Sequence, residues 1–180
     1  MLALSAVVFS ASAFAQTGGK VIIVDFTRVQ EDSLVGQNVI SQLTQYGNAV
    51  QARKEALEAQ LNKEGTDLEA QEVVLPPDAF QQRVDEFQRK ARLADLELQG
   101  YRSTMVRAEQ NAKLEITNNL KPIVNAIMNE KGADLVLDKN LIYMAAGGFD
   151  VTDLVVSRLD STVQQYSLGL QAPTLDGPGN

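Results

Sequence analysis

The sequence contains no cysteine, no histidine and no tryptophan. Without cysteine there is no disulfide framework, whatever the redox state of the compartment. Because cysteine and histidine are both absent, the common ligands of zinc, iron and copper are missing, and so is the usual general base of enzymes. Only a carboxylate site for calcium or magnesium would remain. We therefore predict a protein that is not an enzyme and that carries no cofactor or metal.

Positive charge is also scarce. Sixteen lysines and arginines stand against 23 aspartates and glutamates, so the formal net charge is -7. Binding to nucleic acid needs a basic surface that neutralises phosphates, so nucleic acid is not expected as a partner. The length of 180 residues leaves room for one domain with its own core, or for a small domain with an extended element.

The first 15 residues carry no charged side chain. Their apolar run is too short to span a bilayer, and Ala13-Phe14-Ala15 has the small-x-small pattern of a signal-peptidase site. We interpret residues 1–15 as a secretory signal peptide cleaved after Ala15, with a buried N-terminal helix as the alternative. No second long apolar stretch follows, so the mature protein is expected to be exported and soluble.

An aspartate follows the first β-rich run of the chain. Residues 20–26 read KVIIVDF, a short stretch of β-branched residues that predicts a buried strand. Asp25 stands where several classes of α/β enzyme place a catalytic carboxylate. A haloacid-dehalogenase-type phosphatase would need a second aspartate two positions later, and Thr27 occupies that position. We therefore predict that Asp25 accepts hydrogen bonds from the start of the next helix.

Two long heptad patterns fill the middle of the chain. From about residue 36 to 74, apolar side chains recur at spacings of three, four or seven. They are Val39, Leu43, Tyr46, Val50, Leu57, Leu61, Leu68 and Leu75. In the second pattern, spacings of four and three hold from Phe80 to Ala112. Two such helices joined by a few residues must run antiparallel, so residues 36–131 are predicted to form a hairpin that projects from the rest of the protein.

Prolines and a glycine mark the ends of the second pattern. Two adjacent prolines cannot lie inside a helix and place the turn near residues 75–78. Asp78 with Gln81 predicts a capping box just after the turn. Pro122 lies within the pattern and predicts a kink, and Gly132 predicts the end of the helix.

After the hairpin the pattern changes. Residues 133–140 and 141–148 are two short β-rich runs, which would form a small sheet with the first strand. Residues 149–166 carry an apolar stripe that predicts an amphipathic helix, with Asp150 or Thr152 as its cap.

The predicted fold class is α+β. A body split between residues 20–35 and 132–166 would contain the strands and the closing helix, and the hairpin would project from it. The last residues, 167–180, are rich in glycine and proline without periodicity, and we predict that they are disordered.

Two sets of hairpin residues are candidates for contact with partners, because exposed apolar side chains on a projecting arm are unusual unless something binds there. The apolar set lies close to the turn or outside the seam of the second helix, that is, outside its heptad positions. These residues would contact a client protein: Val73, Val74, Leu75, Leu93 and Leu96. The basic set lies on the second helix: Arg83, Arg89, Lys90 and Arg92. These cations either pair with the acidic first helix or bind an anionic partner such as a membrane surface.

Two stretches flank the hairpin: VIIVDFTRVQEDSLVGQ, from Val21, and GADLVLDKNLIYMAAGGFDVTDLVVSRLD, from Gly132. With the order of the elements, they resemble the Skp (OmpH-like) family of periplasmic chaperones over residues 21–166. The resemblance implies a homotrimer whose small sheets assemble into a β-barrel-like body, with three helical hairpins around a cavity. It implies that the trimer body includes Val21, Ile22, Ile23, Val24, Leu135, Val136 and Leu137.

The same resemblance implies an ATP-independent holdase in the periplasm. Such a protein binds unfolded outer-membrane proteins and keeps them from aggregating, with a weak contact to the membrane or to lipopolysaccharide as a further possible interaction. Two other hypotheses stay open. One is a structural coiled-coil adaptor of the cell envelope that binds a folded partner through the hairpin tip, and the other is a phosphatase-like enzyme built around Asp25.

Overall fold

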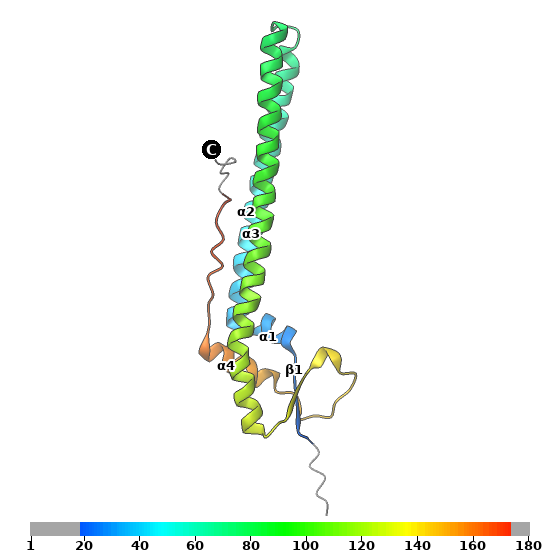
Figure 1. Cartoon of the computed structure of the whole chain (residues 1–180), viewed down its shortest axis with the longest axis vertical. Helices are drawn as coiled ribbons and strands as arrows, with labels where there is room; N and C mark the ends of the chain where they lie inside the picture. The colour runs from blue at the N-terminus through cyan, green and yellow to red at the C-terminus, as the bar shows by residue number, and fades with distance from the viewer. Residues whose placement is uncertain (1–18, 174–180) are drawn as a thin grey trace, which may run out of the picture.

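The computed structural model describes residues 19–173, and the predicted signal peptide, residues 1–15, lies outside them. Two long helices dominate the chain, with a small sheet and short helices at one end (Figure 1). The long helices are α2, Leu34–Gln71, and α3, Pro77–Lys131. This arrangement of two long helices and a small sheet agrees with the prediction. Within the described range, no helix has both the length and the hydropathy that a membrane span requires.

The sheet has two parallel strands, β1 (Val21–Val24) and β2 (Leu135–Asp138). The β-branched run explains β1, since three of its four residues are buried. The other edge of β1 is also bonded: Ile23 N–H donates to the Phe149 carbonyl at 2.8 Å, and the Ile23 carbonyl accepts the N–H of Val151 at 2.9 Å. Among the described residues, the outer edge of β2 has no strand partner.

The predicted strand at residues 141–148 is wrong. Lys139–Leu141 form a short 3-10 helix, η1, and the chain then runs as a loop to Phe149. The side chain of Asp138 accepts the N–H of Asn140 at 3.0 Å, which turns the chain directly after β2. The apolar residues of this loop therefore miss the sheet.

A buried serine separates the first two helices. Helix α1, Phe26–Asp32, ends at Ser33, whose hydroxyl then caps α2 by accepting the N–H of Gly36 at 3.2 Å. A Cβ on Gly36 would lie 1.6 Å from the carbonyl oxygen of Gln30, so only glycine fits this approach of the two helices. The junction redirects the chain from the body into the long helix.

Helices α2 and α3 lie side by side along their length (Figure 1). Every apolar residue of the two predicted seams is buried or half-buried. Ion pairs across the helices join Arg53 to Glu97 at 2.7 Å and Lys90 to Glu64 at 2.8 Å. A residue later in α2 thus pairs with a residue earlier in α3. Residues 72–76 connect the two helices.

One end of α3 differs from the prediction, and the other agrees with it. The helix begins at Pro77 without a side-chain hydrogen bond at its cap, so the predicted capping box of Asp78 and Gln81 is wrong. Proline at the first helical position already has the helical φ and lacks one of the N–H groups that a cap would satisfy. The other end is as predicted: α3 stops at Lys131, and Gly132 adopts a left-handed conformation with φ +61°.

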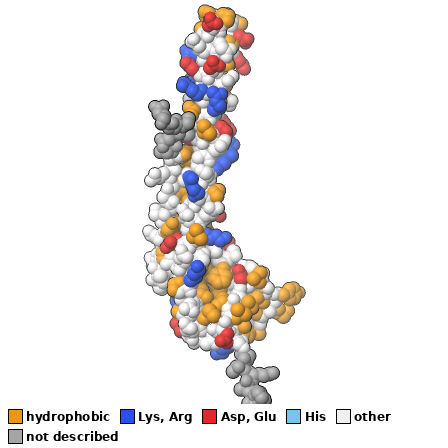
Figure 2. Space-filling model, in the orientation of Figure 1, with side chains coloured by type: hydrophobic (Ala, Val, Ile, Leu, Met, Phe, Trp, Pro, Cys, Tyr) orange, Lys and Arg blue, Asp and Glu red, His pale blue; other side chains and the backbone are white. Residues whose placement is uncertain are grey.

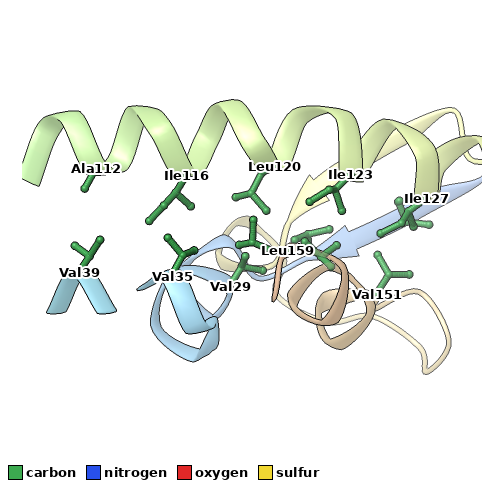
Figure 3. Close-up of a cluster of buried hydrophobic side chains, with 13 residues drawn as sticks. Val29, Val35, Val39, Ala112, Ile116, Leu120, Ile123, Ile127, Val151 and Leu159 are labelled. Atoms are coloured by element: carbon green, nitrogen blue, oxygen red, sulfur yellow. The ribbon is translucent and has the colours of Figure 1, made fainter. Parts of the chain in front are cut away.

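The main core lies where the base of the hairpin meets the short elements (Figure 3). Side chains of α3 such as Ile116 and Leu120 point toward Val35 of α2 and Val29 of α1 (Figure 3). Helix α4, Thr152–Thr162, closes the core from the other side with fully buried apolar residues. Helix α3 supplies this core on both sides of Pro122 and runs through that proline without a break.

The residues after α4 stay on the molecule. Residues 163–173 run as an extended segment beside the hairpin, drawn in orange to red in Figure 1. Tyr166 and Leu168 pack against the edge of the core. The expectation of disorder over residues 167–180 therefore fails for residues 167–173, and the remainder lies outside the described residues.

Candidate functional site

The carboxylate that ends β1 caps a helix. The Oδ1 atom of Asp25 accepts the N–H of Arg28 at 2.9 Å, at the start of α1. The N–H of Asp25 donates to the hydroxyl of Thr152 at 2.9 Å, which ties the strand end to the start of α4. The predicted hydrogen bond between Asp25 and the next helix is thus confirmed, and the contacts of this aspartate connect three elements of the body.

A second carboxylate holds the same corner. The Oδ1 atom of Asp150 accepts the N–H of Thr152 at 2.9 Å and its hydroxyl at 2.5 Å, and Oδ2 accepts the ammonium of Lys139 at 2.8 Å. The bond from Lys139, followed by that from the Thr152 hydroxyl, lowers the pKa of Asp150 to about 2. Asp150 is therefore ionised at neutral pH and fastens the loop after β2 to α4.

These carboxylates serve the fold. Close to Asp25, the guanidinium of Arg28 forms ion pairs with Asp32 at 2.7 Å and with Asp153 at 2.6 Å. These two ion pairs join α1 to α4 on the surface. In residues 19–173, no group of three or more acidic side chains is placed to hold a metal ion. The apolar side chains that are candidates for binding lie elsewhere on the molecule.

One apolar surface covers β2 and the loop after it. We call it the β2 surface, and its exposed members are Leu135, Leu137, Leu141, Tyr143 and Met144. Tyr143 is fully exposed. Figure 2 shows hydrophobic side chains gathered on the projecting loop and on the body beside it. The unpaired edge of β2 adds backbone N–H and C=O groups, which makes this a surface suited to pairing with another chain.

The structure distributes the predicted trimer-body residues between the interior and the surface. Ile22, Ile23 and Val24 are buried within the chain itself, whereas Leu135 and Leu137 are partly exposed on the β2 surface. The other two, Val21 and Val136, are half-buried. Leu141, Tyr143 and Met144 were not predicted as surface residues, because their apolar run is typical of a buried strand. The Asp138-Lys139-Asn140 turn before them indicates a change of direction, but it does not say whether the next run returns to the sheet.

A second apolar surface lies at the hairpin tip. Val73 is 90% exposed and Val74 is 76% exposed, while Leu75 is half-buried against the arm. Leu93 and Leu96 are exposed on α3, but Leu93 lies 16 residues after the helix start, or about 24 Å along its axis. The five predicted contact residues therefore form two separate places along the arm.

The four predicted basic residues differ in their partners. Lys90 bonds Glu64 of α2 and lowers the pKa of that carboxyl, and Arg83 bonds Glu86 at 3.4 Å on its own helix. Among the described residues, Arg89 and Arg92 make no ion pair. Figure 2 shows acidic and hydrophobic side chains at the free end of the arm, with lysine and arginine below them.

The order of these elements matches a known family. The model of the family described as Outer membrane protein (OmpH-like) matches residues 20–159. The chain belongs to the OmpH-like family. The matched region of this OmpH-like chain contains the sheet, the whole hairpin and most of α4, and it ends before the extended segment of residues 163–173.

A solved structure shows the same fold. It is the crystal structure of a candidate outer membrane chaperone (OmpH-like) from Caulobacter crescentus, with a TM-score of 0.79 and 23% sequence identity. The alignment covers 97% of this chain and 99% of that chain. Among curated protein sequences, no match was found. The function of the OmpH-like chain must therefore be argued from its own surfaces.

Proposed function

We propose that this OmpH-like chain is an ATP-independent holdase chaperone of the periplasm, which binds unfolded outer-membrane proteins before their insertion. The observation that carries the proposal is a long two-helix arm, in an OmpH-like fold, with apolar side chains exposed at its tip and along α3. A binder of many unfolded chains needs exposed apolar groups on an adaptable scaffold. The apolar residues of the arm supply such groups at the tip and at several positions along α3.

The β2 surface supports an assembly of three copies. A two-stranded sheet is marginal without further partners, and in this chain its outer edge is apolar and unpaired among the described residues. Contact between the β2 surface of one copy and a different face of the next, as a closed ring of three requires, would bury Leu137 and Tyr143. In a closed ring of three bodies, the three arms would project together and enclose a cavity for the client.

The test of the holdase is a dilution experiment. A β-barrel membrane protein unfolded in urea is diluted into buffer that contains the mature protein and no ATP, and aggregation is followed by light scattering. We expect aggregation to be suppressed at one trimer per client. Full aggregation at that ratio would contradict the proposal.

The test of the assembly is solution mass. Light scattering after size-exclusion chromatography should give three times the chain mass, and Leu137→Lys combined with Tyr143→Glu should give monomers that keep their helix content. Exposed Val106 offers a matched control, because Val106→Lys adds charge to the arm and should leave the trimer intact. A monomeric wild-type chain would refute the trimer.

The exposed valines at the tip favour a second candidate, an envelope adaptor that binds one folded partner. Replacing both Val73 and Val74 by serine should abolish binding by an adaptor, because the whole contact would lie at the tip. The same change should only slightly weaken a holdase, whose contacts are spread over the arm. A pull-down that recovers one stable folded partner from the wild type, and none from this variant, would favour the adaptor.

A weak contact with anionic lipid is a further part of the proposal. Two of the four basic residues are engaged in ion pairs within the chain, which leaves Arg89 and Arg92 to meet an anionic surface. Vesicles that contain phosphatidylglycerol should bind the protein at low salt and release it at high salt. Arg89→Gln with Arg92→Gln should reduce that binding, and binding unchanged by this variant would exclude these arginines.

A further inference from the structure

The extended segment after α4 is held by a row of polar side chains on α2. Asn38, Gln42 and Tyr46 follow each other at intervals of four residues, so they lie on one face of the helix. We call them the polar ladder. The N–H of Tyr166 donates to Asn38 Oδ1 at 3.2 Å, and Gln42 Nε2 donates to the Tyr166 carbonyl at 2.6 Å. The N–H of Leu168 donates to Gln42 Oε1 at 3.2 Å.

The carboxamide of Gln42 bonds the segment as a neighbouring strand would. Its Nε2 atom donates to the carbonyl of Tyr166, and its Oε1 atom accepts the N–H of Leu168. Residues two apart present these groups on the same edge of an extended backbone. Asn38 Oδ1 also accepts Gln42 Nε2 at 2.7 Å, and this bond orients the carboxamide. All three bonds to the segment reach its backbone, so these bonds do not depend on which side chains the bound segment carries.

The upper end of the segment is held in the same way. The hydroxyl of Tyr46 donates to the Gln171 carbonyl at 3.1 Å. Higher on the arm, Pro173 lies so close to α3 that a Cβ on Gly100 would be 2.6 Å from the Cβ of Pro173. A side chain of any other residue at position 100 would push the segment away. The segment thus follows a groove along the arm, which begins at the polar ladder and is lined near its upper end by Gly100 and Thr104 of α3.

The side chains of the segment show which kind of polypeptide fits. Tyr166, Leu168 and Leu170 are half-buried, while Ser167 and Gly169 between them are exposed. This alternation is that of a strand with one apolar face. Strands of outer-membrane β-barrels alternate apolar and polar residues with the same period of two. The groove therefore accepts the pattern that unfolded barrel strands carry.

We propose that the polar ladder and the groove up to Gly100 form a binding site for extended polypeptide of alternating apolar pattern, which the chain's own C-terminal segment occupies until a client strand displaces it. The inference rests on the proposed holdase function. Because the segment is tethered, it competes at high effective concentration, and it covers the groove whenever no client is present.

The site is tested in the full-length chain by freeing the segment. Leu168→Pro removes the N–H that bonds Gln42 and leaves the polar ladder unchanged. A labelled peptide of residues 163–173 should then bind at least about tenfold more tightly than to the wild type, measured by fluorescence anisotropy. Ser167→Pro is the matched control, because no hydrogen bond from its N–H is present among the described residues, and it should leave peptide binding near the wild-type value.

The ladder itself is tested in the freed chain. Adding Gln42→Ala to Leu168→Pro removes two hydrogen bonds to the backbone of the peptide, which should lower its affinity about tenfold. Equal peptide binding by the wild type and Leu168→Pro, or binding that survives Gln42→Ala, would overturn the inference.

Client displacement has its own readout. Hydrogen exchange at the amides of Tyr166 and Leu168 should accelerate when an unfolded β-barrel client is added to the wild-type chain. If these amides stay protected while aggregation is suppressed, the inference fails and the holdase function stands. If the labelled peptide binds Leu168→Pro but no chain suppresses aggregation, the holdase function fails and the peptide site stands.

Discussion

The body and the outer half of the hairpin are built from different contacts. In the body, large aliphatic side chains such as Ile127, Val155 and Leu159 are completely buried. The rings of Tyr46 and Tyr101, whose centroids are 5.9 Å apart, mark the start of the outer half. Between this contact and the tip, the only buried apolar residues that the structure describes are Leu57 and Ala94. Alanine removes little area from water, so the outer arm gains much less from burial per turn than the body.

This difference implies two levels of stability within one chain. Regions with few buried contacts open with lower free energy than a packed core, so the arm should open locally while the body stays folded. Partly exposed ion pairs such as Arg53 with Glu97 align the two helices but add little stability compared with the burial of apolar groups. A stable body with a yielding arm is what a binder of differently shaped unfolded clients requires.

The largest effect is expected from Leu159→Ala in the body. Leu159 is completely buried, and its truncation leaves a cavity enclosed by α1, α3 and α4. The free energy of unfolding should fall by about 3–5 kcal/mol, measured by urea denaturation. Val106→Ala on the exposed face of α3 is the control and should change it by less than about 0.5 kcal/mol. A loss below about 1 kcal/mol for Leu159→Ala would show that the body is not the stable half.

The next effect concerns the corner between β1 and α4. Thr152→Val keeps the shape of the side chain but leaves the N–H of Asp25 without its hydroxyl acceptor. We expect a loss of about 1–3 kcal/mol in the free energy of unfolding. Thr152→Ser retains the hydroxyl and should lose clearly less. Equal losses for the two variants would mean that packing of the methyl group, rather than the hydrogen bond, stabilises the corner.

A smaller effect is expected from Leu57→Ala in the arm. Leu57 is 8% exposed, but the two helices around it are open to solvent and can move together to fill the space. The loss should be about 1–2 kcal/mol, at or below the low end of values for enclosed cores. Hydrogen exchange should accelerate in the outer arm and remain slow in the body. Acceleration of the body amides by the same factor would show that arm and body unfold as one unit.

The smallest effect is expected from acid, and it should separate the two regions by pH. Arg53 lowers the pKa of Glu97 below its ordinary value of 4.5, and Lys139 lowers the pKa of Asp150 from 3.8 to about 2. Since each carboxyl has a lower pKa in the folded chain than in the unfolded chain, its contribution is complete above the ordinary value and is lost as the pH falls through the folded value.

The arm should therefore begin to loosen below about pH 4.5, and the corner at Asp150 between about pH 4 and 2, each by less than about 1 kcal/mol. Hydrogen exchange at a series of pH values measures both regions. Glu97→Gln combined with Glu64→Gln should remove the pH dependence of the arm alone, because the pKa of each of these carboxyls is lowered by a cation of the other helix. Asp150→Asn should remove that of the corner alone. A pH dependence that persists in both variants would assign it to other carboxyls.

Local patterns were sufficient for the regular elements. The spacing of apolar residues identified both long helices and their buried faces, Gly132 identified the end of α3, and the β-branched run identified β1. The hydrogen bond of Asp25 was also predictable, because a carboxylate before a helix start has backbone N–H groups within reach.

The candidate surfaces could not be predicted from local patterns, because they depend on contacts between residues that are far apart in the sequence. The run from Leu141 to Met144 has the composition of a strand, yet the turn after β2 directs it away from β1. The apolar stripe predicted a helix up to residue 166, yet α4 ends at Thr162 and the chain continues as an extended segment. Hydrogen bonds hold Tyr166 and Leu168 to side chains that lie 124 to 128 positions earlier in the sequence. Neither outcome can be obtained from a window of neighbouring residues.

The sequence by itself determined the two helices, the first strand and the class of the fold, because these follow from side-chain periodicity over neighbouring turns. Only the tertiary structure decided that apolar residues after β2 face outward and that Asn38 and Gln42 hold the C-terminal backbone. The physical reason is that burial and hydrogen bonding at these places involve partners more than 100 residues apart, which meet only after the hairpin has brought the two ends of the body together.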